Sequence, residues 1–226
     1  MSDAKHLDHA RLQRIYFARQ NRLNRHFNSR MRRALSWLER AEQETDDPHA
    51  GFLFYWISFN AGYSPQLDDI NQKEAAKRRQ YFNMISECDS RKLIHELVWQ
   101  KRNVEIKRLL KNEFIYGPFW EVNDPISDVS WKPGFRSQGR EINKAFKTQN
   151  TAKILNILFG RLYVLRNQLI HGNATWQGSR NRRQVEDGYK IISKLQHLFL
   201  LTMLNNPNRD WGKVSYDLYA EGFDDY

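Results

Sequence analysis

The chain has 226 residues and a formal charge of +10, and 40% of its residues are hydrophobic. This hydrophobic content excludes a globally disordered chain and is enough for one domain with a core. The excess of 36 Lys and Arg over 26 Asp and Glu favours a polyanion such as nucleic acid as partner, although solubility alone also accounts for it. Cys88 is the only cysteine, which excludes an internal disulfide and a cysteine-based zinc site and fits a reducing cytoplasm.

Residues 1–48 are expected to form an arginine-rich N-terminal helix, running from about residue 9 to residue 44. Its apolar residues recur at helical spacing, and nine arginines between Arg11 and Arg40 face a single acidic residue, Glu39. The segment Asp46-Asp47-Pro48 should end this helix. The basic face is either a track for phosphates or an ordinary solvated surface; it comprises Arg11, Arg14, Arg22, Arg25, Arg32 and Arg33.

The middle of the chain changes character twice. Residues 51–63 are apolar nearly all round, which is typical of a helix inside a bundle, and the stretch is too short to span a bilayer. Two more polar helices are expected over residues 70–88 and 90–113. Turn-forming Gly, Pro and Asn residues then interrupt every periodic pattern, so residues 116–140 are predicted to form an irregular insertion.

Residues 151–206 should form the last two helices. The first runs to about residue 171 from an N-cap at Asn150 or Thr151, and Gly172 is placed to stop it. The second covers about residues 182–204, with Asn181 and Gln184 resembling a capping box. Residues 1–10 are polar and do not form a signal peptide. The sequence therefore predicts one all-α domain over residues 1–226, cytoplasmic and without membrane segments.

The segment from Arg166 to Gly172 carries the chemistry of most interest. An arginine fork matches phosphate oxygens, and a histidine can move a proton near neutral pH. Asn167 could orient either the imidazole of His171 or the phosphate. The same residue types also serve as ordinary caps at helix C-termini. On an ideal helix Arg166 and His171 lie about 140° apart, so a shared phosphate requires either a distorted helix end or two copies of the motif.

The string Arg166-Asn167-Gln168-Leu169-Ile170-His171-Gly172 resembles the Arg-Asn-x-x-x-His motif of the HEPN superfamily (higher eukaryotes and prokaryotes nucleotide-binding). The resemblance covers roughly residues 152–210, with a fainter match at residues 50–63, where Asn60 would be a supporting polar residue. The arginine-rich N-terminal helix and residues 116–140 lie outside it.

The resemblance implies an up-and-down helical bundle that forms a homodimer with its motifs facing a shared cleft. Many members of the superfamily are ribonucleases that act as toxins or in antiviral defence, and they cleave without a metal or other cofactor. Carried over, Arg166 would bind the phosphate, His171 would be the general acid and base, and Asn167 would assist. Arg180, Arg182 and Arg183 follow the motif closely and would bind RNA.

Other candidate sites rank lower. Glu105-Ile106-Lys107 has the form of a metal-nuclease motif but lies in a predicted helix, where a salt-bridging face is the better interpretation. Asp68-Asp69 should begin a helix, and Asp224-Asp225 lies near the end of the chain. Four histidines were considered as ligands and ranked below core or surface roles, two of them in an N-terminal stretch expected to be poorly ordered: His6, His9, His95 and His197.

Two functions compete. The first is a metal-independent endoribonuclease, acting as a toxin or defence effector with an antitoxin protein as a further partner. The second is a non-catalytic HEPN module that binds RNA, a nucleotide or a protein. The presence of both Arg166 and His171 favours the nuclease. A DNA-binding protein is disfavoured because no helix-turn-helix spacing is found.

Overall fold

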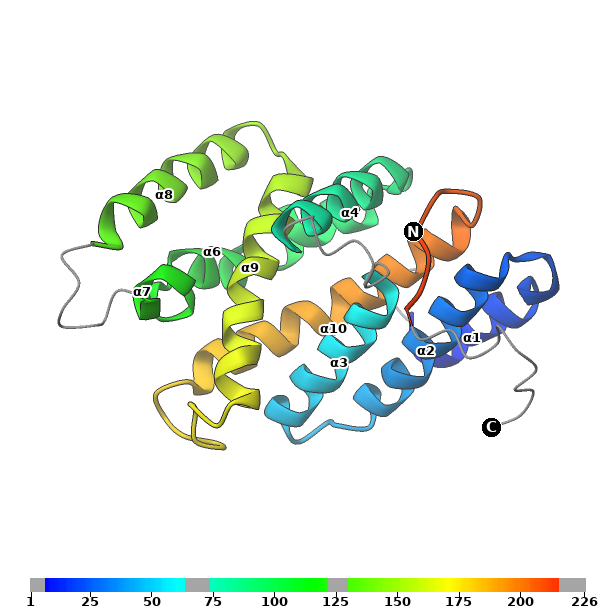
Figure 1. The fold of residues 1–226 in the computed structure, drawn as a ribbon, viewed down its shortest axis with the longest axis horizontal. Helices are drawn as coiled ribbons and strands as arrows, with labels where there is room; N and C mark the ends of the chain where they lie inside the picture. Colours follow the sequence, from blue (N-terminus) through cyan, green and yellow to red (C-terminus); the bar gives the residue numbers. More distant parts are fainter. Residues whose placement is uncertain (1–6, 64–73, 122–129, 216–226) are drawn as a thin grey trace.

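The computed structural model describes residues 7–63, 74–121 and 130–215, and within these ranges every regular element is helical (Figure 1). This confirms the predicted all-α class. None of the described helices combines the length and apolar character needed to cross a membrane. The pairs Asp68-Asp69 and Asp224-Asp225, and His6, lie outside the described residues.

The prediction of one long N-terminal helix is wrong. The segment divides into α1 (His9–Phe17), the short 3-10 helix η1 (Gln20–Arg22) and α2 (Arg25–Glu42). The break occurs because Asn24 is an N-cap: its side chain accepts a hydrogen bond from Phe27 N at 2.9 Å, which starts a new helix. The apolar spacing continues across the break because α1 and α2 bury their faces in the same core, so periodicity concealed it.

Helix α3 (Pro48–Tyr63) runs beside α2 through the centre of the molecule (Figure 1). Asp47, predicted to end the preceding helix, also begins this one, because its Oδ1 accepts from His49 N at 2.8 Å. The apolar circumference predicted for this helix is confirmed by an aromatic core around it. Phe59 is its centre, with ring centroids 4.4 Å from Phe159 and 6.1 Å from Phe82.

The polar helices of the middle segment are confirmed only in outline. Helix α4 covers Glu74–Cys88 and packs along α9. The stretch predicted as one helix over residues 90–113 contains α5 (Leu93–Glu96), a π-helical turn η2 (Leu97–Lys101) and α6 (Asn103–Lys111), followed by the 3-10 turn η3 (Glu113–Ile115).

The prediction of an irregular insertion over residues 116–140 is also wrong for the described part of that segment. It holds α7 (Gly117–Glu121) and the first half of α8 (Lys132–Lys147). Pro133 lies in the first turn of α8, where a proline costs no hydrogen bond, so it starts this helix instead of breaking it. Tertiary contacts, including an aromatic cluster formed by Tyr116, Trp131 and Phe135, offset the poor helix propensity of two glycines.

The last two helices agree with the prediction. Helix α9 is Thr151–Ile170, and Asn150 caps it by accepting from Lys153 N at 2.9 Å. Helix α10 is Arg182–Asn205. The capping box is not formed, however, because the Asn181 side chain makes no cap hydrogen bond and its backbone is already helical.

Candidate functional site

The motif closes α9 through a glycine-dependent cap. Gly172 has φ +69°, and its N–H donates to Leu169 O while Asn173 N donates to Gln168 O at 2.8 Å. These two bonds form a Schellman motif, which satisfies carbonyl groups at the helix end and favours glycine at the left-handed position. The predicted stop at Gly172 is confirmed. His171, immediately before it, is left exposed at the end of the helix.

Arg166 and Asn167 form a side-chain pair one turn before this end. Arg166 Nη1 donates to Asn167 Oδ1 at 2.9 Å, which fixes one edge of the guanidinium. Arg166 Nε is buried and makes no hydrogen bond, so one donor of the fork has no protein partner. A phosphate oxygen is an acceptor that such a donor can take.

Helix α9 remains regular up to the motif's last residue. The N–H of His171 still donates to Asn167 O at 3.0 Å, the i to i−4 bond of an α-helix. The helix end is therefore not distorted in a way that turns Arg166 and His171 toward one another, and within the described residues no hydrogen bond joins them. One of the two routes to a shared phosphate, a distorted helix end, is absent from this part of the chain.

The loop that follows the motif is anchored to the start of α3. Trp176 Nε1 donates to Asp47 Oδ2 at 2.9 Å, although 65% of the Trp176 side chain is exposed. Burial raises the pKa of the Asp47 carboxyl, but the Trp176 hydrogen bond and two backbone N–H donors outweigh it, so this pKa is lowered overall. The loop is thus held in place and presents its indole to solvent.

The predicted arginine cluster lies on the same loop. Arg180, Arg182 and Arg183 are all exposed, and Arg182 Nη2 also donates to Gln177 O at 2.8 Å. The structure therefore brings this cluster close in sequence and space to the end of α9, at the lower left of Figure 1.

Asn60 is not placed near the motif. Helices α3 and α9 run past each other so that Phe59 meets Phe159, whereas Leu165 approaches Phe52 at the other end of α3, where both contact Gly188. Asn60 therefore lies two turns of α3 away from the level of the motif, and the sequence similarity around it does not translate into proximity.

A buried ion pair supports α10 beside the motif. Arg108 of α6 forms two hydrogen bonds, at 2.7 and 2.8 Å, with the carboxylate of Asp187, which is 3% exposed. Two-point geometry of this kind fixes the relative position of two elements. Sequence reasoning missed the pair because 79 residues separate its members.

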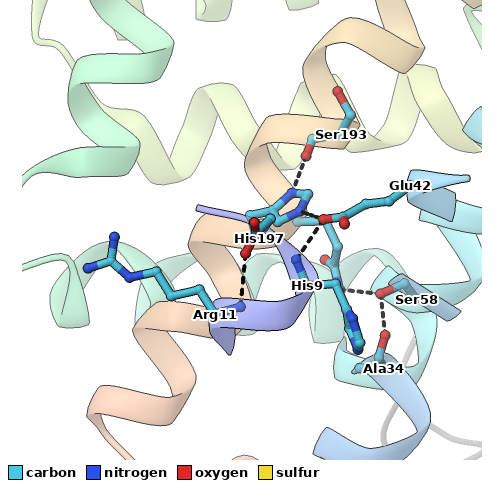
Figure 2. Close-up of polar contacts among 9 residues, drawn as sticks. His9, Arg11, Ala34, Glu42, Ser58, Ser193 and His197 are labelled. Carbon is cyan, nitrogen blue, oxygen red and sulfur yellow. Dashed lines mark hydrogen bonds and ion pairs between the residues drawn. The ribbon is translucent and has the colours of Figure 1, made fainter. Parts of the chain in front are cut away.

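A second polar cluster joins α1, α2 and α10 (Figure 2). His197 Nδ1 donates to Ser193 O, its Nε2 contacts Glu42 Oε1, and His9 N donates to the same oxygen at 2.7 Å. Both ring nitrogens of His197 are used in these contacts, so its role is structural. His9 is buried in α1, and the prediction that it belongs to a poorly ordered start is wrong.

Several other predicted features have structural roles. Glu105 pairs with Arg102 at 3.1 Å on α6, which confirms a salt-bridging face. Among the nine N-terminal arginines, Arg30 is fully buried, donates to Gly62 O at 2.9 Å and cannot be part of a phosphate track. Within the described ranges, no group of three or more acidic, His or Cys side chains is arranged to hold a metal ion.

Arg161 is a buried cation that the sequence did not reveal. It is 3% exposed, lies over the ring of Tyr116 at 4.5 Å and donates to Gln138 Oε1 at 2.6 Å. Burial lowers its pKa to about 10. It therefore fastens α8 to α9, one and a half turns before Arg166.

Comparisons of the chain with family models, with curated proteins and with solved structures each found no match.

Proposed function

We propose that the end of α9 binds an RNA phosphate and that the chain is a HEPN-type, metal-independent endoribonuclease. The observation that carries this proposal is the exposed imidazole of His171 at a capped helix end, one turn beyond an arginine with an unsatisfied buried donor. The carboxyl end of a helix favours a charged imidazole, which suits an acid or a phosphate ligand. The exposed arginines at positions 180, 182 and 183 would hold the flanking phosphates.

The proposed reaction needs two proton transfers. A base takes the proton from a ribose 2′-OH, and that oxygen attacks the adjacent phosphorus. The bond from phosphorus to the 5′ oxygen breaks, and an acid gives this oxygen a proton, leaving a 2′,3′-cyclic phosphate and a 5′-hydroxyl. His171 would supply base and acid, and the Arg166 fork would stabilise the charge on the phosphorane oxygens.

We further propose that a homodimer assembles the site. Because α9 is regular through His171 N, the ideal separation of about 140° between Arg166 and His171 applies within one chain. Two copies related by a twofold axis can place the arginine of one beside the histidine of the other, and two histidines would then serve as base and acid. An up-and-down bundle with facing motifs is the arrangement that the family resemblance implies.

A non-catalytic RNA-binding module is the alternative. The hydrogen bond from Arg166 to Asn167 in the same chain favours it, because that contact occupies part of the fork. Binding alone requires only the exposed arginines and the indole of Trp176, on which an unpaired base can stack.

The two functions are separated by incubating the purified protein with total RNA in EDTA. We compare wild type with His171→Ala and Arg166→Ala, and use Arg136→Ala, an exposed arginine of α8, as control. A nuclease loses about 10²–10⁴-fold in rate in each motif variant and leaves DNA uncut. RNA that is bound but uncut, with or without divalent metal, would sink the nuclease in favour of the module. Cleavage that EDTA stops would contradict the metal-independent mechanism and direct attention to Glu105.

A further inference from the structure

A pocket of about 480 Å³ lies between α1, η1 and the first half of α2. Its volume falls within the range of sites that bind small molecules. It is remote from the motif: α1 and the start of α2 are at the right of Figure 1, and the α9–α10 loop is at the lower left. Nothing in the proposed nuclease site uses it.

One wall of this pocket is a polar stripe on α2. Arg25, Asn28, Ser29 and Arg32 all line it and occupy positions i, i+3, i+4 and i+7 of the helix. Residues at this spacing share one helix face, which is normally apolar when it faces another element. Here the four side chains are hydrogen-bonding groups, with a guanidinium at each end and about 10 Å of helix rise between the two arginines.

The opposite wall is held in a fixed position by Asn28. Its amide nitrogen donates to Gln20 O at 2.9 Å and to Leu23 O at 3.2 Å, which ties η1 to α2. Both donor positions of the amide are therefore used within the protein. Its Oδ1 is buried and accepts no hydrogen bond. A buried acceptor without a partner costs free energy, and a ligand N–H or O–H can satisfy it.

The electrostatics of the lining select an anion. Arg25 and Arg32 are its two charged groups, and none of the described residues that line it is acidic. The buried Tyr16 borders the pocket and offers an aromatic surface. Burial raises the pKa of its phenol, which remains neutral, and the positive charge of Arg32 opposes that shift.

We propose that this pocket binds a nucleoside phosphate. The phosphate would lie on the arginine forks of α2, and the base or sugar would donate to Asn28 Oδ1 against the Tyr16 side. This assignment is independent of Arg166 and His171. The ligand is either a free nucleotide or the phosphorylated 5′ end of an RNA chain, because both present the same groups.

Isothermal titration of the full chain with AMP, ADP and inorganic phosphate tests the proposal. The test variant is Arg25→Gln/Arg32→Gln, and the control is Arg14→Gln/Arg136→Gln, which removes two exposed arginines elsewhere on the surface. We expect the test variant to bind nucleotide at least about 30-fold more weakly and the control to stay within about threefold, because a charge-assisted hydrogen bond contributes about 1.5–3 kcal/mol. Circular dichroism checks that both variants are folded, and Arg25→Lys/Arg32→Lys should restore part of the affinity.

Each other outcome is decisive. No binding of either nucleotide at millimolar concentration, or an equal loss in the control variant, would overturn the site. Inorganic phosphate binding as tightly as AMP would overturn the nucleoside part, since Asn28 would then play no role. Displacement of AMP by a 5′-phosphorylated oligonucleotide, and not by its 5′-hydroxyl form, would identify the RNA end as the source. Retained AMP binding in His171→Ala, whether or not that variant cleaves RNA, separates this site from the nuclease.

Discussion

Trp176 and Asp47 are 129 residues apart, and a hydrogen bond of 2.9 Å from the indole Nε1 to the carboxylate Oδ2 fastens the motif loop to the start of α3. The same carboxylate caps α3 through its other oxygen. A single aspartate therefore positions two elements that border the candidate site.

Replacing Trp176 with Phe should loosen this connection without removing an aromatic ring. The pKa of Asp47 should rise toward its ordinary value, because the indole donor that stabilises its ionised form is gone. The loss of stability should be small, at most about 1 kcal/mol, since the bond is exposed. NMR titration of the Asp47 carboxyl measures the shift, and an unchanged pKa would show that the backbone donors alone set it.

RNA binding should depend steeply on salt through the loop arginines. Replacing Arg180, Arg182 and Arg183 with Gln should flatten the plot of log affinity against log salt, because fewer counterions are released when RNA binds. Each lost phosphate contact should lower the slope by roughly 0.7–0.9. A slope that does not change would assign the cluster to solubility.

The chain should be a homodimer in solution with Arg166 and His171 near the twofold axis. The regular end of α9 motivates this, because one chain does not turn the two side chains toward each other. Light scattering coupled to size exclusion measures the mass. Mixing Arg166→Ala with His171→Ala should restore about a quarter to a half of the cleavage activity per mixed dimer if the site is shared. A monomer at working concentration would remove the shared-cleft mechanism.

Two helical glycines should respond oppositely to alanine. A Cβ at Gly188 would lie 3.2 Å from Leu165 Cδ2 and from Phe52 Cε2, whereas a Cβ at Gly139 of α8 would meet nothing within 4 Å. Gly188→Ala should therefore destabilise the protein by about 1–3 kcal/mol through overpacking. Gly139→Ala should stabilise it by about 0.5–1 kcal/mol through helix propensity. Urea unfolding decides, and stabilisation by both would mean that α10 can move away from α9.

Glu42 should contribute stability that is lost in acid. Burial raises the pKa of its carboxyl, but hydrogen bonds from His197 and from His9 N outweigh this, so the pKa is lowered in the folded state. A lowered folded pKa means stability that is present above the unfolded pKa and disappears as pH falls below about 4.3. The difference in unfolding free energy between wild type and Glu42→Gln should be largest near neutral pH and shrink in acid. A difference that is constant from pH 3 to pH 7 would contradict an ionised Glu42.

The sequence by itself determined features that depend on local spacing. The apolar stripes of α9 and α10, the cap at Asn150 and the stop at Gly172 all appear in the structure because each follows from residues within one or two helical turns. The all-α class follows from the same periodicity. The candidate motif was also found this way, since its residues are consecutive.

The tertiary structure decided what depends on contacts between distant residues. The break at Asn24 was hidden because α1 and α2 share one core, and residues 132–140 became helical because Arg161 and an aromatic cluster hold α8 in place. The pairs Trp176 with Asp47 and Arg108 with Asp187 join residues 129 and 79 positions apart. The pocket beside Arg25 and Arg32 exists only because Asn28 folds η1 back onto α2. Such contacts depend on which helices lie side by side, which the burial of the whole core determines and no local pattern encodes.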